Sequence, residues 1–452
     1  MKKYILLPSC VILSACVSDG LDVSKPTEPL NWTAKNSEIA QSVNAIYLQG
    51  WWKQFKDPTL NALVAQALEN SPDRLIAEAK IAEARGLRRS SRSSLFPQIG
   101  ISGSNGRADT GASSASSYSF YDAKFDASFE IDVFGKNRKE FSASDSNLKA
   151  AQARYHDVSL TLIAEIVRTY IDFRAAQNQT RIAAKNLNSQ ARTLKLIGDL
   201  NRLGEAPKLD VERAETLVNT TRASLPEFKR QTENARLRLS VLTGGLPENI
   251  LPMLVAHAEI PGGNIEPVLM TPAQVLALRP DIQAAAADLA ANTSLAEAAT
   301  ADIFPNFTLS GFYGIADNAL ASSVTPWNIA FGAAVSLLDF GRIEGRIDAA
   351  RAREKQAFEQ YRKAVLNAVT EVETAFSDYA HINEQHVSLR KAYLSADKAL
   401  ELSQTLYKEG EISFLDVLDA QRSANKAEAA MVSATATQAE SLTRLFKSLG
   451  VY

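Results

Sequence analysis

Two long stretches without proline constrain this chain more than any other feature. They cover residues 136–203 and 342–409, and each contains one glycine. A helix of about 68 residues would be about 100 Å long, and apolar residues recur at the spacing of a coiled coil. The residues spaced by seven in the second stretch are Val365, Val372, Tyr379, His386, Tyr393, Leu400 and Tyr407. Both stretches are too charged to span a bilayer, so we predict long helices that pack on helical neighbours.

Each long stretch belongs to a unit that occurs twice, at an offset of 206 to 208 residues. The matched motifs are Pro72-Asp73 and Pro280-Asp281, Phe96-Pro97 and Phe304-Pro305, Phe134-Gly135-Lys136 and Phe340-Gly341-Arg342, Gly204-Glu205 and Gly410-Glu411, and Leu209-Asp210-Val211 and Leu415-Asp416-Val417. Each half predicts a helix, a β-hairpin, a long helix and a return helix, so the fold is mainly α with a small β part. We place the first repeat at 57–243, a proline-rich linker at 244–271 and the second repeat at 272–452.

The segment before each long helix has the alternation of β-strands. In residues 121–132 the charged side chains Asp122, Lys124, Asp126 and Glu130 share one face, and the opposite face is apolar. The predicted strands are residues 96–104, 120–132, 304–315 and 327–338. A soluble, half-buried hairpin would have the same pattern.

The number of strands bears on assembly if the hairpins enter a membrane. An open sheet edge is not tolerated in lipid, and four strands are too few to close a barrel. Two, three or four copies of the chain would supply 8, 12 or 16 strands, and the strand pattern does not choose among them.

The N-terminus has the features of a secretory signal. Lys2 and Lys3 precede a short apolar core, and the sequence LSAC that ends at Cys16 resembles a bacterial lipoprotein box. We predict removal of residues 1–15, a lipid on Cys16 and an extended tether through residue 56. The alternatives are an ordinary signal peptide or lipidation of Cys10, which a nearby proline makes the poorer candidate. With cysteines only at these two positions, a disulfide framework is excluded for the rest of the chain.

The sequence contains no recognisable constellation for catalysis. The net charge of −2 offers no general attraction to nucleic acid. His381 and His386 are five residues apart, which does not place them on one helical face as a metal pair, and His386 lies on the predicted coiled-coil seam. No GxSxG, HExxH or phosphate-binding loop occurs. We therefore expect no enzyme activity, no metal and no cofactor apart from the lipid.

The duplicated unit, the lipoprotein box and the motifs FGK, FGR and LDVLDAQR together resemble TolC-type outer-membrane efflux channels, and in particular the lipoprotein branch that includes OprM. The most specific stretch is LYKEGEISFLDVLDAQRS, residues 406–423. The resemblance covers essentially the whole mature chain. It implies a homotrimer with a 12-stranded β-barrel in the outer membrane of a Gram-negative bacterium, on a long α-helical coiled-coil tunnel in the periplasm.

The resemblance also implies a function and partners. The channel would be the passive exit duct of a tripartite efflux pump for drugs or other small molecules. It would be anchored by its lipid and the surrounding outer-membrane lipid, and would dock to a periplasmic adaptor and an inner-membrane transporter of the RND type. Export of a protein or peptide through the same duct is an alternative. A non-conducting, envelope-spanning coiled coil is another, and the charged strand face in residues 121–132 argues against it.

A closed state is expected at the periplasmic tip, where the second long helix turns back. Asp416, Asp419 and Arg422 are three residues apart and lie on one helical face. By resemblance these residues and Tyr407 match the constriction and its bonding network. The alternative is an exposed ion pair worth a few tenths of a kcal/mol. Arg213 stands where Asp419 would repeat, so we expect the second-half helices to move more on opening.

Overall fold

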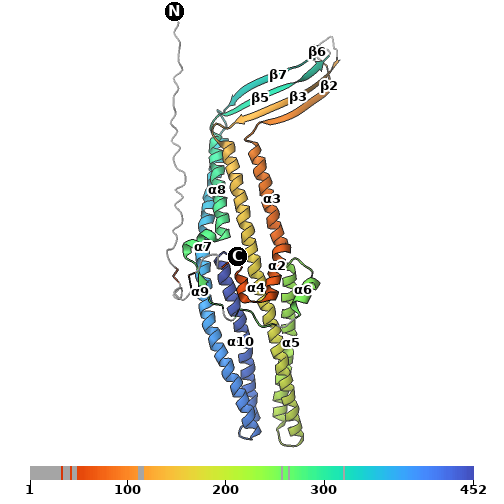
Figure 1. Ribbon diagram of the computed structural model, residues 1–452, viewed down its shortest axis with the longest axis vertical. Helices are drawn as coiled ribbons and strands as arrows, with labels where there is room; N and C mark the ends of the chain where they lie inside the picture. The colour runs from red at the N-terminus through yellow and green to blue at the C-terminus, as the bar shows by residue number, and fades with distance from the viewer. Residues whose placement is uncertain are drawn as a thin grey trace, which may run out of the picture.

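The structure is a computed structural model that describes residues 32–33, 41–42, 48–109, 117–255, 258–262, 265–318 and 321–452. Long helices run along the molecule, and a β-sheet lies at one end (Figure 1). The predicted signal peptide and Cys16 lie outside the described residues. No helix in the described part of the chain contains a span long and apolar enough to cross a membrane.

Both repeats have the predicted order of elements. The first contains α2 (Pro58–Asn70), α3 (Pro72–Ser93), β2 (Gln98–Asp109), β3 (Ser117–Ile131), α4 (Lys136–Arg202) and α5 (Lys208–Leu242). The second contains α7 (Pro272–Leu278), α8 (Pro280–Ala301), β5 (Asn306–Asn318), β6 (Ala321–Val324), β7 (Trp327–Ala334), α9 (Arg342–Lys408) and α10 (Phe414–Ser448). The long helices α4 and α9 have 67 residues each, and their bounds agree with the predicted ranges to within one residue at either end.

The helices form a wall whose upper and lower halves differ in composition. Near the sheet, α4 contacts α3 and α8, and α8 contacts α9; farther down, α4 contacts α5 and α10, and α10 contacts α9 (Figure 1). Helix α8 therefore begins in the layer where α10 ends, between the two long helices. This arrangement buries apolar residues of both long helices most completely in their upper and middle parts, whereas the seam residues His386, Tyr393 and Leu400 in the lower part of α9 are only partly buried.

The sheet is antiparallel, with strand order β2-β3-β5, and both β6 and β7 pair with β5. All four predicted strands need corrected bounds, and β3 begins at Ser117 and not at residue 120. Strand β2 begins after Pro97, which has no N–H to donate, and continues to Asp109. Strand β5 extends to Asn318, where it pairs with the unpredicted β6. Strand β7 ends at Ala334 because its partner residue, Asn306, is the first residue of β5.

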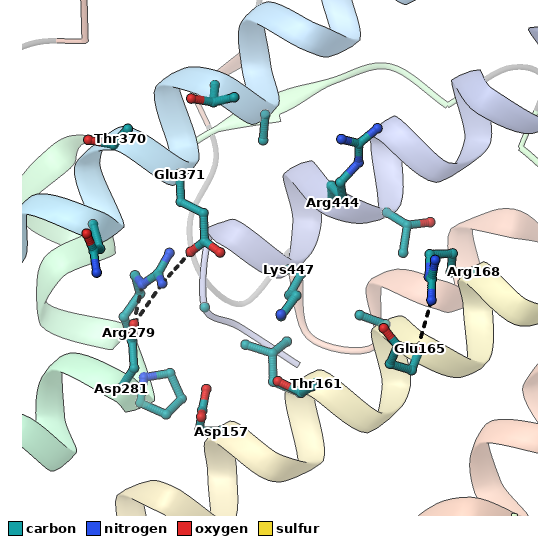
Figure 2. A pocket seen from close by; sticks show the side chains of 18 of the residues that line it. Asp157, Thr161, Glu165, Arg168, Arg279, Asp281, Thr370, Glu371, Arg444 and Lys447 are labelled. Atoms are coloured by element: carbon teal, nitrogen blue, oxygen red, sulfur yellow. Dashed lines mark hydrogen bonds and ion pairs between the residues drawn. The ribbon is translucent and has the colours of Figure 1, made fainter. Parts of the chain in front are cut away.

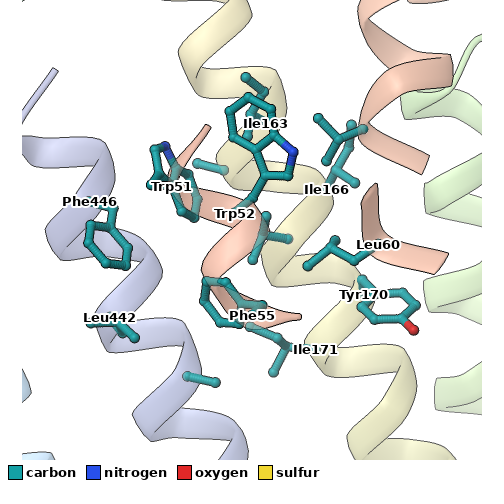
Figure 3. Packing of buried hydrophobic residues seen from close by; sticks show 14 of the residues in the cluster. Trp51, Trp52, Phe55, Leu60, Ile163, Ile166, Tyr170, Ile171, Leu442 and Phe446 are labelled. Carbon is teal, nitrogen blue, oxygen red and sulfur yellow. The ribbon is translucent and has the colours of Figure 1, made fainter. Parts of the chain in front are cut away.

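A small layer packs on one side of the wall and contains the main core. The segment predicted as tether ends in a 3-10 helix, η2 (Trp51–Phe55), and the linker contains α6 (Pro247–Leu254) and β4 (Val268–Leu269), which pairs with β1 (Gln41–Ser42). Trp51 is fully buried and stacks on Phe446 of α10 with ring centroids 5.3 Å apart (Figure 3). The cluster joins η2 and α2 to the middle of α4 and α9 and to the C-terminal part of α10.

A buried polar chain ties this layer to α4. Asp57 caps α2 by accepting a 3.0 Å hydrogen bond from the backbone N–H of Leu60. Its other carboxylate oxygen accepts a 2.7 Å bond from the Tyr170 hydroxyl, which in turn accepts from Arg174 Nε at 2.9 Å. Arg174 is only 1% exposed. The partners satisfy groups that would otherwise be buried without hydrogen bonds.

The turns that end the two long helices have the same backbone conformation. Gly204 and Gly410 both have φ of 79°, a conformation that a glycine adopts without a steric penalty. The next residues donate back into the preceding helix: Glu205 N–H to Leu200 O at 2.9 Å, and Glu411 N–H to Leu406 O at 3.0 Å. These bonds end each long helix in the same way and start the return helix.

Candidate functional site

The sheet has one apolar face that is exposed in this chain. Ile101, Phe125, Tyr313 and Trp327 occupy one row across four strands, paired in the order β2, β3, β5 and β7. Their exposed fractions are 76%, 58%, 61% and 69%. A continuous apolar row of this size on a monomeric surface indicates contact with another apolar phase.

The opposite face carries the charged side chains predicted for it. Ser102 Oγ donates a 2.7 Å hydrogen bond to Asp126, and Ser104 donates to Asp122. Lys124 lies over the Phe312 ring, 5.5 Å from its centroid, an aromatic contact that the alternation in residues 121–132 did not indicate. Glu130 lies on the same face of β3, so all four charged residues are brought together as a polar surface.

Aromatic side chains mark the foot of the sheet. Phe134 stacks on Phe304 with centroids 4.4 Å apart and lies 6.4 Å from Phe307. Their repeat counterparts are also exposed: Phe96, the counterpart of Phe304, is 53% exposed, and Phe340, the counterpart of Phe134, is 97% exposed. Aromatic girdles of this kind occur at the membrane interfaces of outer-membrane strands.

The structure brings the four predicted tip residues to one end of the helical wall. Tyr407 lies 5.7 Å from Phe414, ring centroid to ring centroid, and packs with Ile197 and Val417 in a small apolar cluster. Burial, and then the nearby charge of Asp210, raises the pKa of Tyr407. Asp210 belongs to the first repeat, so the two tips are in electrostatic contact. Sequence reasoning did not single out Asp210, although it is the repeat counterpart of Asp416.

Asp416 and Asp419 have different partners. The Asp416 carboxylate accepts from the N–H and the hydroxyl of Ser413 at 3.0 and 2.6 Å, which caps α10 and lowers the pKa of Asp416. Asp419 accepts from Arg422 at 3.4 Å, and both are exposed. Within one chain the structure therefore pairs Asp419 with Arg422 and assigns Asp416 to its own helix end. In the first repeat the ion pair lies one turn earlier: Arg213, at the position of Asp419, contacts Asp210, at the position of Asp416, at 3.4 Å.

A charged cavity of about 860 Å³ lies where α8 begins and α10 ends (Figure 2). The carboxyl groups that line it are those of Asp157, Glu165, Asp281, Glu371, Asp378 and Glu440, and the cations are Arg168, Arg279, Arg444 and Lys447. It opens on the side of α4 opposite the core, because Ile163 and Ile166 of that helix face the core cluster. The sequence analysis did not identify this cavity.

Arg279 holds the junction together. Its guanidinium donates to Asp281 at 2.8 and 3.0 Å, to Glu371 of α9 at 2.6 Å and to the Ser448 carbonyl of α10 at 2.8 Å. The side chain is only 9% exposed. A Cβ on Gly450 would come within 2.6 Å of Arg279, so the backbone after α10 has to be glycine for this approach. One arginine thereby joins three helices.

Two carboxyl groups of the cavity are shifted toward their protonated form. Burial, reinforced by the neighbouring Asp172 carboxylate, raises the pKa of Glu440 to about 7, against the opposing effect of Arg168 and Arg444. Burial, and then the charge of Asp281, raises the pKa of Asp157. The charge of this cavity therefore changes near neutral pH.

The two histidines of α9 form hydrogen bonds within the helical wall. His386 Nε2 lies 3.2 Å from Thr435 Oγ1, and His381 Nδ1 lies 2.8 Å from the Ser377 carbonyl. No group of three histidine, cysteine, aspartate or glutamate side chains among the described residues is arranged to hold a metal ion.

Comparison with known sequences gives matches along both repeats. The profile of the family described as "Outer membrane efflux protein" matches residues 63–245 and 271–451. The pyoverdine export outer membrane protein OpmQ of Pseudomonas aeruginosa is 28% identical over 471 residues, which cover 100% of this chain and 97% of that protein. The cation efflux system protein CusC of Escherichia coli K12 is 26% identical over 437 residues, which cover 94% of each.

Comparison with solved structures gives the same extent of likeness. The outer-membrane channel OprN superimposes with a TM-score of 0.87 at 30% identity, over 95% of this chain and 98% of that one. The open state of the MtrE outer membrane channel of Neisseria gonorrhoeae superimposes with a TM-score of 0.84 at 26% identity, over 95% and 97%. Both the sheet and the helical wall described above lie within these matches.

Proposed function

The chain belongs to the outer membrane efflux protein family, and on that premise we propose that three copies form the passive exit duct of a tripartite efflux pump. The protein is an outer-membrane efflux channel that exports small molecules, like its relatives. The single observation that supports the assembled duct is that the sheet has an exposed apolar row on one face and charged residues on the other.

Closure of the barrel follows from the edges of that sheet. Strands β2 and β7 have no further strand partner within the described residues. Backbone groups left unpaired in lipid are costly, so the edges of one copy pair with those of the next. Three copies of the four long strands give a barrel of about 12 strands, with Phe125 facing lipid and Asp126 facing the lumen.

The tip is the proposed periplasmic gate. Tyr407, Asp416, Asp419 and Arg422 lie at the end of the wall farthest from the sheet, and symmetry would bring three sets of them together around the axis. The proposed partners are a periplasmic adaptor and an inner-membrane transporter of the RND type, which supplies the energy. The names of the relatives include both pyoverdine export and cation efflux, so we propose small molecules as the cargo class.

The proposed lipid anchor on Cys16 is compatible with where the described chain begins. Trp32 Nε1 donates to the Met270 carbonyl at 2.6 Å, and the Thr33 N–H donates to Glu373 of α9 at 2.5 Å. Glu373 lies about 46 Å below the first residue of α9, by the helix rise. The 16 residues back to Cys16 can span about 55 Å, so a lipid there reaches the foot of the sheet.

Two experiments test the proposal. Purified protein inserted into planar bilayers should give discrete conductance steps, and Asp126→Arg should shift the preference for cations against anions without loss of the assembled species. Absence of any conductance from correctly assembled protein would favour a structural coiled coil over a duct. Mass spectrometry of the mature N-terminus should find acyl chains on Cys16; an unmodified N-terminus at another residue would rule out the anchor.

A further inference from the structure

A row of three arginines lies on the last turns of α3, just below the sheet. Arg85, Arg89 and Arg92 are spaced by four and three residues, so they share one helical face. All three are exposed, and none forms an ion pair with another described residue. Arg88, between them, is different: it bonds to Asp145 of α4 at 2.6 Å and lies over the Phe141 ring, and so contributes to helix packing.

The row lies at the depth of lipid headgroups. Arg92 is 5.9 Å from the Phe96 ring, which belongs to the aromatic set at the foot of the sheet. Arg85 is about 10 Å lower along α3, by the helix rise. The headgroup layer adds about 5–8 Å on each side of the hydrocarbon. Arg92 and Arg89 thus lie within that layer, and the long side chain of Arg85 can extend up to it.

The row also lies on the outer side of the wall. One face of α3 packs against α4, and Arg74, which has the same angular position as Arg85 and Arg92, donates to the Leu68 carbonyl of α2. Helix α2 belongs to the layer opposite the charged cavity. The arginines therefore face away from the side on which the cavity opens.

The fold by itself does not require these arginines. At the 208-residue offset the second repeat keeps the aromatic residue, Phe304, but has Thr293, Glu297 and Thr300 in place of the row. A helix dipole favours cations only in the last turn, and Arg85 lies two turns before the end of α3. The same structural unit therefore forms without the positive charge.

We propose that Arg85, Arg89 and Arg92 bind the phosphate of an anionic phospholipid in the inner leaflet of the outer membrane. Guanidinium groups match phosphate oxygens in a bidentate geometry, and adjacent arginines on one face can hold one headgroup from several directions. The aromatic set at the foot of the sheet fixes the depth of the acyl chains, and the row supplies the charge beneath it. The inference rests on the barrel proposed above, because the barrel sets the membrane level.

The test is native mass spectrometry of the detergent-solubilised protein with phosphatidylglycerol or phosphatidylcholine of the same acyl chains. The wild-type protein should retain more phosphatidylglycerol than phosphatidylcholine. Each of Arg85→Gln, Arg89→Gln and Arg92→Gln should lower that preference by about fivefold, and the triple variant should abolish it. Raising the salt concentration should weaken binding to the wild type alone.

A matched control removes the same charge elsewhere. The control changes three exposed arginines on the lower parts of α4 and α5, far from the sheet: Arg181, Arg192 and Arg222. Their triple change to glutamine should leave the lipid preference intact. The proposal is overturned if the wild type shows no preference, or if the α3 variants keep it. Loss of the trimer with an unchanged preference would instead assign the row to a contact between copies. If the triple variant does not assemble, the lipid preference of the single variant Arg89→Gln is the deciding measurement. Absence of wild-type conductance would refute the duct, but the lipid measurement does not depend on it.

Discussion

Replacing Arg279 tests whether the junction between α8, α9 and α10 holds the wall together. Arg279→Met keeps most of the side-chain volume and removes the charge. It leaves Asp281 and Glu371 without their counter-ion, and leaves the carbonyl of Ser448 without its donor. The expected result is a less stable protein whose secondary structure is otherwise preserved.

The expected loss of stability in Arg279→Met follows from how exposed Arg279 and its carboxylate partners are. Breaking a fully buried ion pair costs about 3–5 kcal/mol, and an exposed one contributes at most about 1 kcal/mol. Arg279 is 9% exposed, whereas Asp281 and Glu371 are 33% and 51% exposed and can regain water. We therefore expect a loss of about 2–4 kcal/mol in the free energy of unfolding. Adding Glu371→Gln should recover part of it, because the double variant leaves one carboxylate fewer unpaired.

The assay is denaturant unfolding in detergent, followed by far-ultraviolet circular dichroism at one protein concentration, because assembly makes stability depend on concentration. The control is Arg362→Met on α9, the helix that carries Glu371. Arg362 and Glu359 are in contact at 3.4 Å, and their side chains are 57% and 52% exposed. That change should cost less than about 1 kcal/mol. Equal losses for Arg279→Met and Arg362→Met would refute the reasoning.

Three further predictions concern the gate, the strands and the cavity. Asp419→Ala or Arg422→Ala should raise single-channel conductance and sensitivity of cells to a large antibiotic while trimer levels stay normal; wild-type behaviour in both assays would leave these residues as an exposed helical ion pair. Phe125→Arg should destabilise the folded protein by about 2–4 kcal/mol if it lies near the membrane midplane, whereas Asp126→Arg should leave the amount of trimer unchanged, and equal losses would contradict the assignment of faces. The pKa of Glu440 is raised from its ordinary value of 4.5 to about 7, so the stability that its protonated form contributes is fully present below pH 4.5 and is lost as the pH rises through about 7. Glu440→Gln should flatten this part of the pH profile of unfolding, and an unchanged profile would exclude the group.

Elements with a local signal could be predicted closely. The bounds of α4 and α9 could be predicted because the apolar period is repeated along each helix and each helix ends at a recognisable turn. The charged face of β3 could likewise be predicted, because alternation depends on residues a few positions apart. Strand ends were less accurate, because pairing, not local pattern, decides where β7 stops.

The candidate site could be predicted only in part from the sequence. The predicted turn lies at the tip of the wall, but the sequence grouped Asp416 with Asp419 and Arg422, whereas in the structure Asp416 bonds to Ser413. The contact of Asp210 with Tyr407 crosses from one repeat to the other, and no spacing within either repeat encodes it.

By itself the sequence determined the duplicated unit, the length of its helices and the two faces of its strands, since each depends on contacts within a few residues. Tertiary structure alone decided that Trp51 lies in the core and that Arg279 joins three helices. Arg279 and Ser448 are 169 residues apart in the chain, and only the end-to-end placement of α8 and α10 brings them together. Contacts between residues so far apart in the sequence depend on how whole helices pack. That packing is set by the sum of many distant contacts and not by any local pattern.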